Sequence, residues 1–295
     1  MTYKPKAEMK RKNSVCKPVE KIDTSCSDKD FEEVVVDEYG VIYSNDGKRL
    51  LRCSSQFKSS EYKIKSGTQV ICNDAFWRCF SLKNLDIPES VTSIGECAFY
   101  KCDSLQSIVI PDSVTTIRDH TFRECKSLEI VVIPDSVTVI GSYAFCECES
   151  LQSIVIPSSV TAIAHNTFWG CGSLRSIVIP NSVTTIGDNA FCWCSSLQSI
   201  VIPSSVTAIG DYAFYECSSL QSIAIPDSVT YIGDDAFSCC ESLQNIVIPE
   251  SVTSIGDEAF RECGSLQSIV IPDSVTFIGK NAFPDSCKVI RRKRD

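Results

Sequence analysis

The sequence predicts a repeat solenoid, in which a regular coil carries a parallel β-sheet on one face and short helical or 3-10 turns on the other side. Two observations lead to this fold class. Ten phenylalanines stand 23 residues apart from Phe76 to Phe283, and nine prolines keep the same step from Pro88 to Pro272. An unbroken period of this length is the sequence signature of stacked repeats.

Each repeat reads as one coil. In the segment S-I-V-I-P, the β-branched run predicts a short strand with Ile108 and Ile110 facing the core. The alternate residues, Ser107 and Val109, then face outward. After the proline, V-T-T-I predicts a second extended piece, and D-x-A-F-x-x-C predicts one helical or 3-10 turn with Ala, Phe and Cys on the core side. One coil has too little apolar surface to fold alone, so the coils must stack.

The stack needs covers at both ends, and its ten phenylalanine-bearing coils, with strands about 4.8 Å apart, would form a rod or shallow arc about 45–50 Å long. We expect a disordered polar arm at residues 1–33, an N-terminal β-hairpin cap at 34–60, the solenoid at 61–290 and a basic tail at 291–295. Asn45-Asp46-Gly47, between V-I-Y and L-L, is a strong hairpin signal. Near the other end, Lys288 to Ile290 can supply a last strand.

Composition narrows the possible partners and locations. The formal net charge of −9 and the pI near 4.9 disfavour binding to nucleic acid or to an anionic membrane surface. No apolar stretch approaches the roughly 18 residues that span a bilayer, and no signal peptide is recognisable. We therefore expect a cytoplasmic protein whose 18 cysteines are reduced. The alternative is a cell-surface or secreted protein that is exported without a signal peptide.

The unit L-x-x-I-x-I-P-x-S-V-T-x-I-G-x-x-A-F-x-x-C closely resembles the BspA-type leucine-rich repeat. The resemblance extends from about Glu61 to Cys287, and the preceding G-V-I-Y-S-N-D-G-K-R-L-L is similar to a hairpin that this family uses. It implies a right-handed leucine-rich-repeat solenoid. Many members are surface proteins that bind host or matrix proteins, so the resemblance adds a cell-surface adhesin as an alternative function.

The cysteines, histidines and acidic residues are the candidates for metal binding or catalysis. A column of cysteines follows phenylalanine by three residues, at Cys79, Cys102, Cys125, Cys148, Cys171, Cys194, Cys217, Cys240 and Cys263. Parallel side chains in a column do not converge on a metal, so we interpret them as buried free thiols that fill the core. His120 and His165 occupy different repeat positions, which repeat drift explains. The acidic columns suggest a solvated polar face rather than a calcium site.

We accordingly predict no enzyme activity, no cofactor and no metal. The sequence has no nucleophile and base pair, phosphate loop or cofactor fingerprint. An ice-binding solenoid is a remote alternative. The regular threonine column suggests it, but the residues of the next column are too uneven for the flat array, two residues wide, that ice binding would need. The oligomeric state is left open.

The predicted function is a non-catalytic scaffold that binds a partner protein along the outward face of the parallel sheet. Repeated valine on an exposed strand makes an apolar stripe, and such stripes commonly mark interaction sites, although strand geometry also favours valine without any ligand. The candidate residues are Ser107, Val109, Val132, Ser153, Val155, Ser176, Val178, Ser199, Val201, Ser222, Val247 and Val270.

Overall fold

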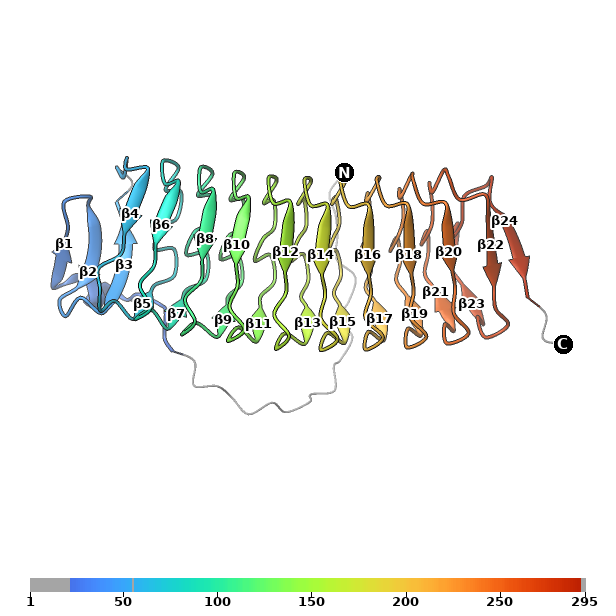
Figure 1. Cartoon of the computed structure of the whole chain (residues 1–295), viewed down its shortest axis with the longest axis horizontal. Coiled ribbons are helices and arrows are strands. Elements are labelled where there is room, and N and C mark those ends of the chain that lie inside the picture. The colour runs from blue at the N-terminus through green and yellow to red at the C-terminus, as the bar shows by residue number, and fades with distance from the viewer. Residues whose placement is uncertain (1–21, 55, 293–295) are drawn as a thin grey trace.

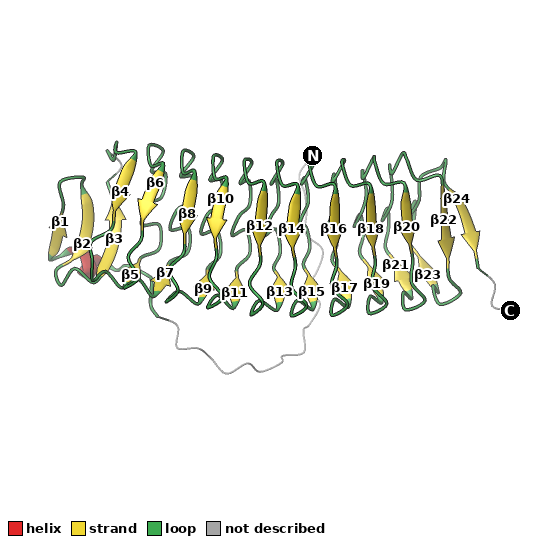
Figure 2. Ribbon diagram, in the orientation of Figure 1, coloured by secondary structure: helices red, strands yellow, loops and turns green. Residues whose placement is uncertain are grey.

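The computed structural model describes residues 22–54 and 56–292, which form one rod of stacked coils with the two ends of the stack far apart (Figure 1). Almost all regular structure is β, and 3-10 helix η1 (Asp28–Phe31) is the one helix in these ranges (Figure 2). The parallel solenoid predicted from the 23-residue period is confirmed.

Each coil contributes one long and one short strand. The long strands are β4 (Glu61–Lys63), β6 (Asn84–Asp86), β8 (Ser107–Val109), β10 (Ile130–Val132), β12 (Ser153–Val155), β14 (Ser176–Val178), β16 (Ser199–Val201), β18 (Ser222–Ala224), β20 (Asn245–Val247) and β22 (Ser268–Ile271). The short strands are β5 (Val70–Ile71), β7 (Ser93–Ile94), β9 (Thr116–Ile117), β11 (Val139–Ile140), β13 (Ala162–Ile163), β15 (Thr185–Ile186), β17 (Ala208–Ile209), β19 (Tyr231–Ile232), β21 (Ser254–Ile255) and β23 (Phe277–Ile278). Where neighbouring strands of a set pair, they pair in parallel in the repeat register, as in Ile200 opposite Ile223. The long-strand ladder is interrupted between β10 and β12, between β14 and β16 and between β20 and β22, and the short-strand ladder between β7 and β9 and between β11 and β13.

The phenylalanine column is the axis of the core. Nine of its ten rings are fully buried, and Phe283 at the end of the column is partly buried. Successive rings stack with centroids 5.2–5.8 Å apart from Phe76 to Phe283. Nine such steps make a column about 50 Å long, close to the length expected from strand spacing.

The expected helical or 3-10 turns are absent from the coils of the described residues, which corrects that part of the prediction. Overlapping β-turns take their place, with Asn189 and Trp193 at φ 56° and 64° in the left-handed region. Along each turn, backbone N–H groups donate alternately to a carbonyl of the same coil and to a carbonyl of the next coil. Cys192 donates to the Asn189 carbonyl (3.2 Å), whereas Phe191 donates to that of Ala213 (2.8 Å). A helical turn would direct these donors along its own axis, and the link between coils would be lost.

Hydrogen bonds therefore join neighbouring coils on three sides, along the long strands, the short strands and the turns. Because these hydrogen bonds fix the distance between neighbouring coils on all three sides, they limit how far the stack can bend. The coils lie in a nearly straight row in Figure 1.

A three-stranded antiparallel unit closes the N-terminal end. Its strands are β1 (Val34–Val36), β2 (Val41–Ser44) and β3 (Arg49–Cys53), and β3 continues into the solenoid by pairing in parallel with β5. The turn between β2 and β3 holds Gly47 at φ 70°, where glycine has no steric cost. The hairpin expected at Asn45-Asp46-Gly47 is present.

Residues 22–33 are ordered against the solenoid, which differs from the disordered arm expected over residues 1–33. The carbonyl of Ile22 accepts from Arg118 Nη2 (3.0 Å), and that of Asp23 accepts from Arg49 Nη1 (2.9 Å). The carbonyl of Thr24 accepts the Asn73 N–H (2.8 Å). Backbone carbonyls anchor this polar segment. Its amino-acid composition therefore does not reveal that it is ordered. Residues 1–21 of the expected arm lie outside the described residues.

The C-terminal end carries the predicted last strand. Strand β24 (Lys288–Arg291) pairs in parallel with β22, with Val289 opposite Ile269. Arg291 belongs to this strand rather than to a separate tail. Residues 293–295 of the expected basic tail lie outside the described residues.

Candidate functional site

The sheet face, meaning the outward side of the long strands, carries the two predicted ladders. Along each strand the central residue is buried while its two neighbours face outward. The valines of the second ladder are exposed by between 47% at Val270 and 79% at Val201. In the first ladder Ser107 is half-buried, and Ser153, Ser176, Ser199 and Ser222 are exposed.

The sheet face is nearly free of charge through the middle of the rod. Gln152 and Gln198 precede their strands on the exposed side, and Arg175 is the basic residue between them. A few positions interrupt the ladders, notably exposed Ile130 in place of serine and exposed Ala224 in place of valine. The result is a long strip of methyl, hydroxyl and amide groups that a partner can cover without desolvating many ions.

The cysteine column is buried as predicted, and its thiols have a further role. From Cys102 to Cys263, each donates to the carbonyl of the phenylalanine 26 residues earlier, at 3.1–3.2 Å. Cys171, for example, donates to Phe145. Burial raises the pKa of the Cys171 thiol. A protonated, satisfied thiol is a poor nucleophile, so this column is structural.

A different cysteine environment exists near the N-terminal end. Half-buried Cys26 and buried Cys72 belong to a small apolar cluster with Leu51 and Val70. The interaction with Cys72 lowers the pKa of Cys26 to about 7, with help from the nearby Arg49 guanidinium. The same interaction raises the pKa of Cys72. Cys26 is thus the thiol best poised to react in the described part of the chain.

The aspartates that follow the repeat glycine link neighbouring coils, because their carboxylates accept backbone N–H groups of the next coil. Asp188 Oδ1 accepts the N–H of Asp211 (3.2 Å), and Asp211 Oδ1 accepts that of Asp234 (2.9 Å). His165 occupies the same repeat position, and its Nδ1 accepts the Asp188 N–H (3.2 Å). Each carboxylate is committed to its neighbour. Within residues 22–54 and 56–292, no group of three or more His, Cys, Asp or Glu is placed to hold a metal ion.

Serine and threonine also link the coils. The Ser182 hydroxyl donates to the Val160 carbonyl (2.6 Å) and so satisfies a backbone group at the turn. The Thr184 hydroxyl donates to the Thr161 carbonyl of the preceding coil (3.3 Å). Both columns therefore have structural duties.

The histidines do not form a site together. His120 stacks on Tyr143 with ring centroids 4.7 Å apart, whereas His165 belongs to the acidic column. Their coils replace alanine by Thr121 and Thr167, and both threonine hydroxyls are buried and bonded to backbone carbonyls. This arrangement agrees with the interpretation of the histidines as repeat drift.

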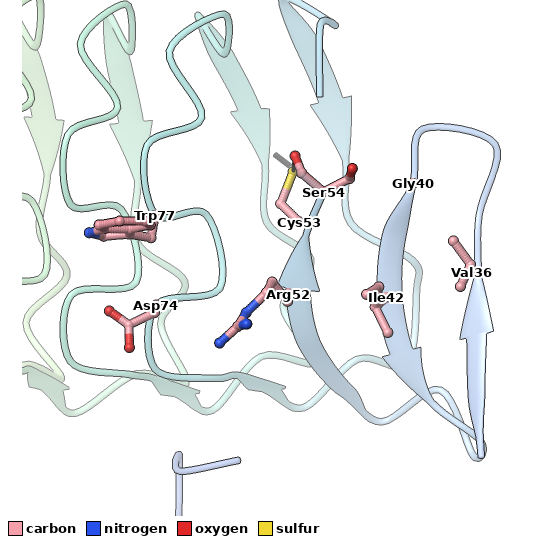
Figure 3. Close-up of a pocket in the computed structure, with 8 residues that line it drawn as sticks. All are labelled: Val36, Gly40, Ile42, Arg52, Cys53, Ser54, Asp74 and Trp77. Carbon is pink, nitrogen blue, oxygen red and sulfur yellow. Dashed lines mark hydrogen bonds between the residues drawn. The ribbon is translucent and has the colours of Figure 1, made fainter. Parts of the chain in front are cut away.

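A hollow of about 850 Å³ lies where the N-terminal cap meets the first turns (Figure 3). Cross-strand neighbours Val36, Ile42 and Arg52 form one wall, and Asp74 and Trp77 come from the turn side. All five reach its surface, and burial raises the pKa of Asp74. The hollow combines apolar surface with one acidic and one basic side chain. Its residues come from separate strands and a turn, so no local pattern in the sequence marks it.

The comparison with family models identifies the class of protein that this geometry represents. The model of the BspA type leucine rich repeat region, in 6 copies, matches residues 53–175 and 161–290. The chain belongs to this family.

Solved structures agree with the fold. The chain is similar to a leucine rich cell surface protein from Faecalibacterium prausnitzii A2-165, at 29% identity and a TM-score of 0.51, over 88% of this chain and 86% of that chain. The pneumococcal vaccine antigen PcpA shares the fold at 15% identity and a TM-score of 0.51, over 88% of each chain. No curated protein matches the chain. Among the described residues, no helix is long and apolar enough to cross a membrane.

Proposed function

We propose that the chain is a non-catalytic scaffold that binds a partner protein along the sheet face. The observation that carries the proposal is the valine ladder, which stays exposed although the column that precedes it along the strands is buried. Val201 and Val247 are 79% and 76% exposed. Contiguous apolar surface of this kind favours association with another protein. The chain's family supports the proposal, because repeat solenoids use extended surfaces for binding.

The test is affinity capture from the native source with the triple variant Val155→Glu, Val178→Glu, Val201→Glu. Three carboxylates on neighbouring strands would make an apolar contact costly to form, so a sheet-face partner should be lost. The matched control is Ser158→Glu, Asn181→Glu, Ser204→Glu, which adds the same charge at exposed turn positions where other coils already carry aspartate.

Both variants must first show wild-type circular dichroism and unfolding. If the folded valine variant retains every specific partner, the sheet face is not the binding surface. If both variants lose the partner equally, added charge rather than the valine ladder is responsible.

A second candidate is a cell-surface adhesin. The specific observation is the similarity to the Faecalibacterium prausnitzii cell surface protein. This favours the surface location over the cytoplasmic one expected from composition. Labelling intact source cells with a membrane-impermeant amine reagent tests it: labelled chain supports surface exposure, and label found only after lysis contradicts it.

A further inference from the structure

Two strands at opposite ends of the rod have a free edge among the described residues. Strand β1 is the last strand of the N-terminal sheet, and β24 is the last strand at the other end (Figure 1). Every residue of both strands is exposed, including Val36 and Ile290. An uncovered edge presents unpaired N–H and C=O groups, which can pair with a strand of another chain.

The two free edges carry opposite charge. Acidic residues flank the three valines of β1 on both sides, at Glu32, Glu33, Asp37 and Glu38. Basic residues flank Val289 and Ile290 of β24 on both sides, at Lys288, Arg291 and Arg292. Each edge thus combines a short apolar centre with like charges around it.

These charges decide which edges can meet. Two β1 edges would bring carboxylates together, and two β24 edges would bring basic groups together, so pairing between like ends is repelled. A β1 edge and a β24 edge attract, whichever direction the strands take, because each centre is flanked on both sides. We propose that β1 of one copy pairs with β24 of a second copy, so that copies join head to tail.

This contact goes beyond the proposed function, since it uses the ends of the rod and leaves the sheet face open. It is heterologous, and because the two edges lie at opposite ends of the rod (Figure 1), each added copy presents a free edge for the next one. The paired strands are short and the charges are exposed. Association should therefore be weak, dependent on protein concentration and reduced by salt.

The experiment measures the size distribution of the full chain by sedimentation velocity at low and high salt. The N-end variant is Glu32→Lys with Glu38→Lys, and the C-end variant is Lys288→Glu with Arg292→Glu. Arg291 is left unchanged because its Nη1 donates to the Val275 carbonyl (3.1 Å). The control, Glu89→Lys with Glu241→Lys, changes net charge as the N-end variant does, at exposed positions away from the ends.

Wild type and control should form growing oligomers up to about 0.5 mM at low salt, and each end variant alone should weaken association at least about tenfold. A mixture of the two end variants should recover pairwise association, because the unchanged basic β24 end of the N-end variant then meets the unchanged acidic β1 end of the C-end variant. Recovery also shows that the variants are folded. The proposal is overturned if wild type stays monomeric in low salt, if either end variant associates like wild type, or if the mixture behaves like the separate variants.

Discussion

The corner that follows each short strand permits a quantitative test of how the coils are held together. Most coils place a glycine there against the backbone of the preceding coil. A Cβ added to Gly210 would lie 2.7 Å from the Asp188 backbone nitrogen and 2.7 Å from the Gly187 carbonyl carbon, too close for either atom. Gly264, in a different turn, has no such neighbour within 4 Å. The pair offers a matched comparison of the same substitution.

Two natural coils show what a side chain does at this corner. Arg118 and Ala164 replace the glycine directly after β9 and β13. The short-strand ladder is interrupted just before these strands, between β7 and β9 and between β11 and β13, while it runs unbroken from β13 to β23. The extra atoms therefore separate adjacent coils enough to break their strand pairing.

We predict that Gly210→Ala will lower the free energy of unfolding by about 2–4 kcal/mol. The Gly210 N–H donates to the Ile186 carbonyl at 3.0 Å, and the loss of one such bond costs about 0.5–1.5 kcal/mol. Displacement of the packed backbone adds about 1–3 kcal/mol. Gly264→Ala should change stability by no more than about 0.5 kcal/mol.

The same natural coils suggest a rescue. Thr121 replaces alanine in the coil of Arg118, and its hydroxyl donates to the Arg118 carbonyl at 2.8 Å. Thr167 makes the matching bond to Ala164 at 2.9 Å. Adding Ala213→Thr to Gly210→Ala should therefore recover about 1 kcal/mol.

Urea unfolding, with equal denaturant slopes as the condition for comparison, measures these differences. Amide hydrogen exchange should locate the weakening at the β15–β17 pairing in the single variant. The reasoning is refuted if Gly210→Ala is as stable as Gly264→Ala, or if the added threonine destabilises the protein further.

Three further predictions concern the core, a thiol and a carboxylate. Phe191→Ala should cost ~3–5 kcal/mol, because the fully buried ring stacks on both neighbours; a loss below about 1 kcal/mol in urea unfolding would contradict the stacked core. Native alkylation followed by mass spectrometry should label Cys26 first, with a rate that rises through pH 7, because its pKa is lowered to about 7 while that of Cys72 is raised; equal labelling of both thiols would argue against this assignment. Burial raises the pKa of Asp211, so its ionised form opposes folding at neutral pH and this penalty disappears below the unfolded pKa of about 3.9. Asp211→Asn keeps the acceptor that Asn73 already supplies in its own coil, so the variant should be at least as stable as wild type at pH 7 and should lose its advantage near pH 3; lower stability at pH 7 would show that the charge itself is needed.

The sequence allowed the fold and the core to be predicted because both depend on residues that recur in every repeat. Phe191 and Cys194 hold fixed positions in the period, and both are buried as expected. The turns were predicted wrongly for a physical reason. Aspartate, alanine and phenylalanine in sequence suit a helix start, and what excludes a helix is the hydrogen bond from each coil to the next, which a single repeat does not contain.

Other features depend on contacts between distant segments. Thr24 is buried because its carbonyl and its neighbours' carbonyls are bound by side chains and backbone of the solenoid. The hollow near Trp77 forms only when the cap and the first turns come together. In both cases the local sequence is polar or mixed, and the burial follows from tertiary structure.

The regularity that makes the sheet face visible in the sequence also limits what it can recognise. A ladder of identical residues offers a partner several equivalent positions, one coil apart, with equal contacts in each. The residues that depart from the repeat on this face remove this degeneracy, and in the described structure they include exposed Ile130, Arg175, Ala224 and Asn245. Under the proposed function, a partner that spans several coils on the sheet face would gain binding energy from the repeated valines and its register from these exceptions. Affinity and specificity would then be carried by different residues of the same face.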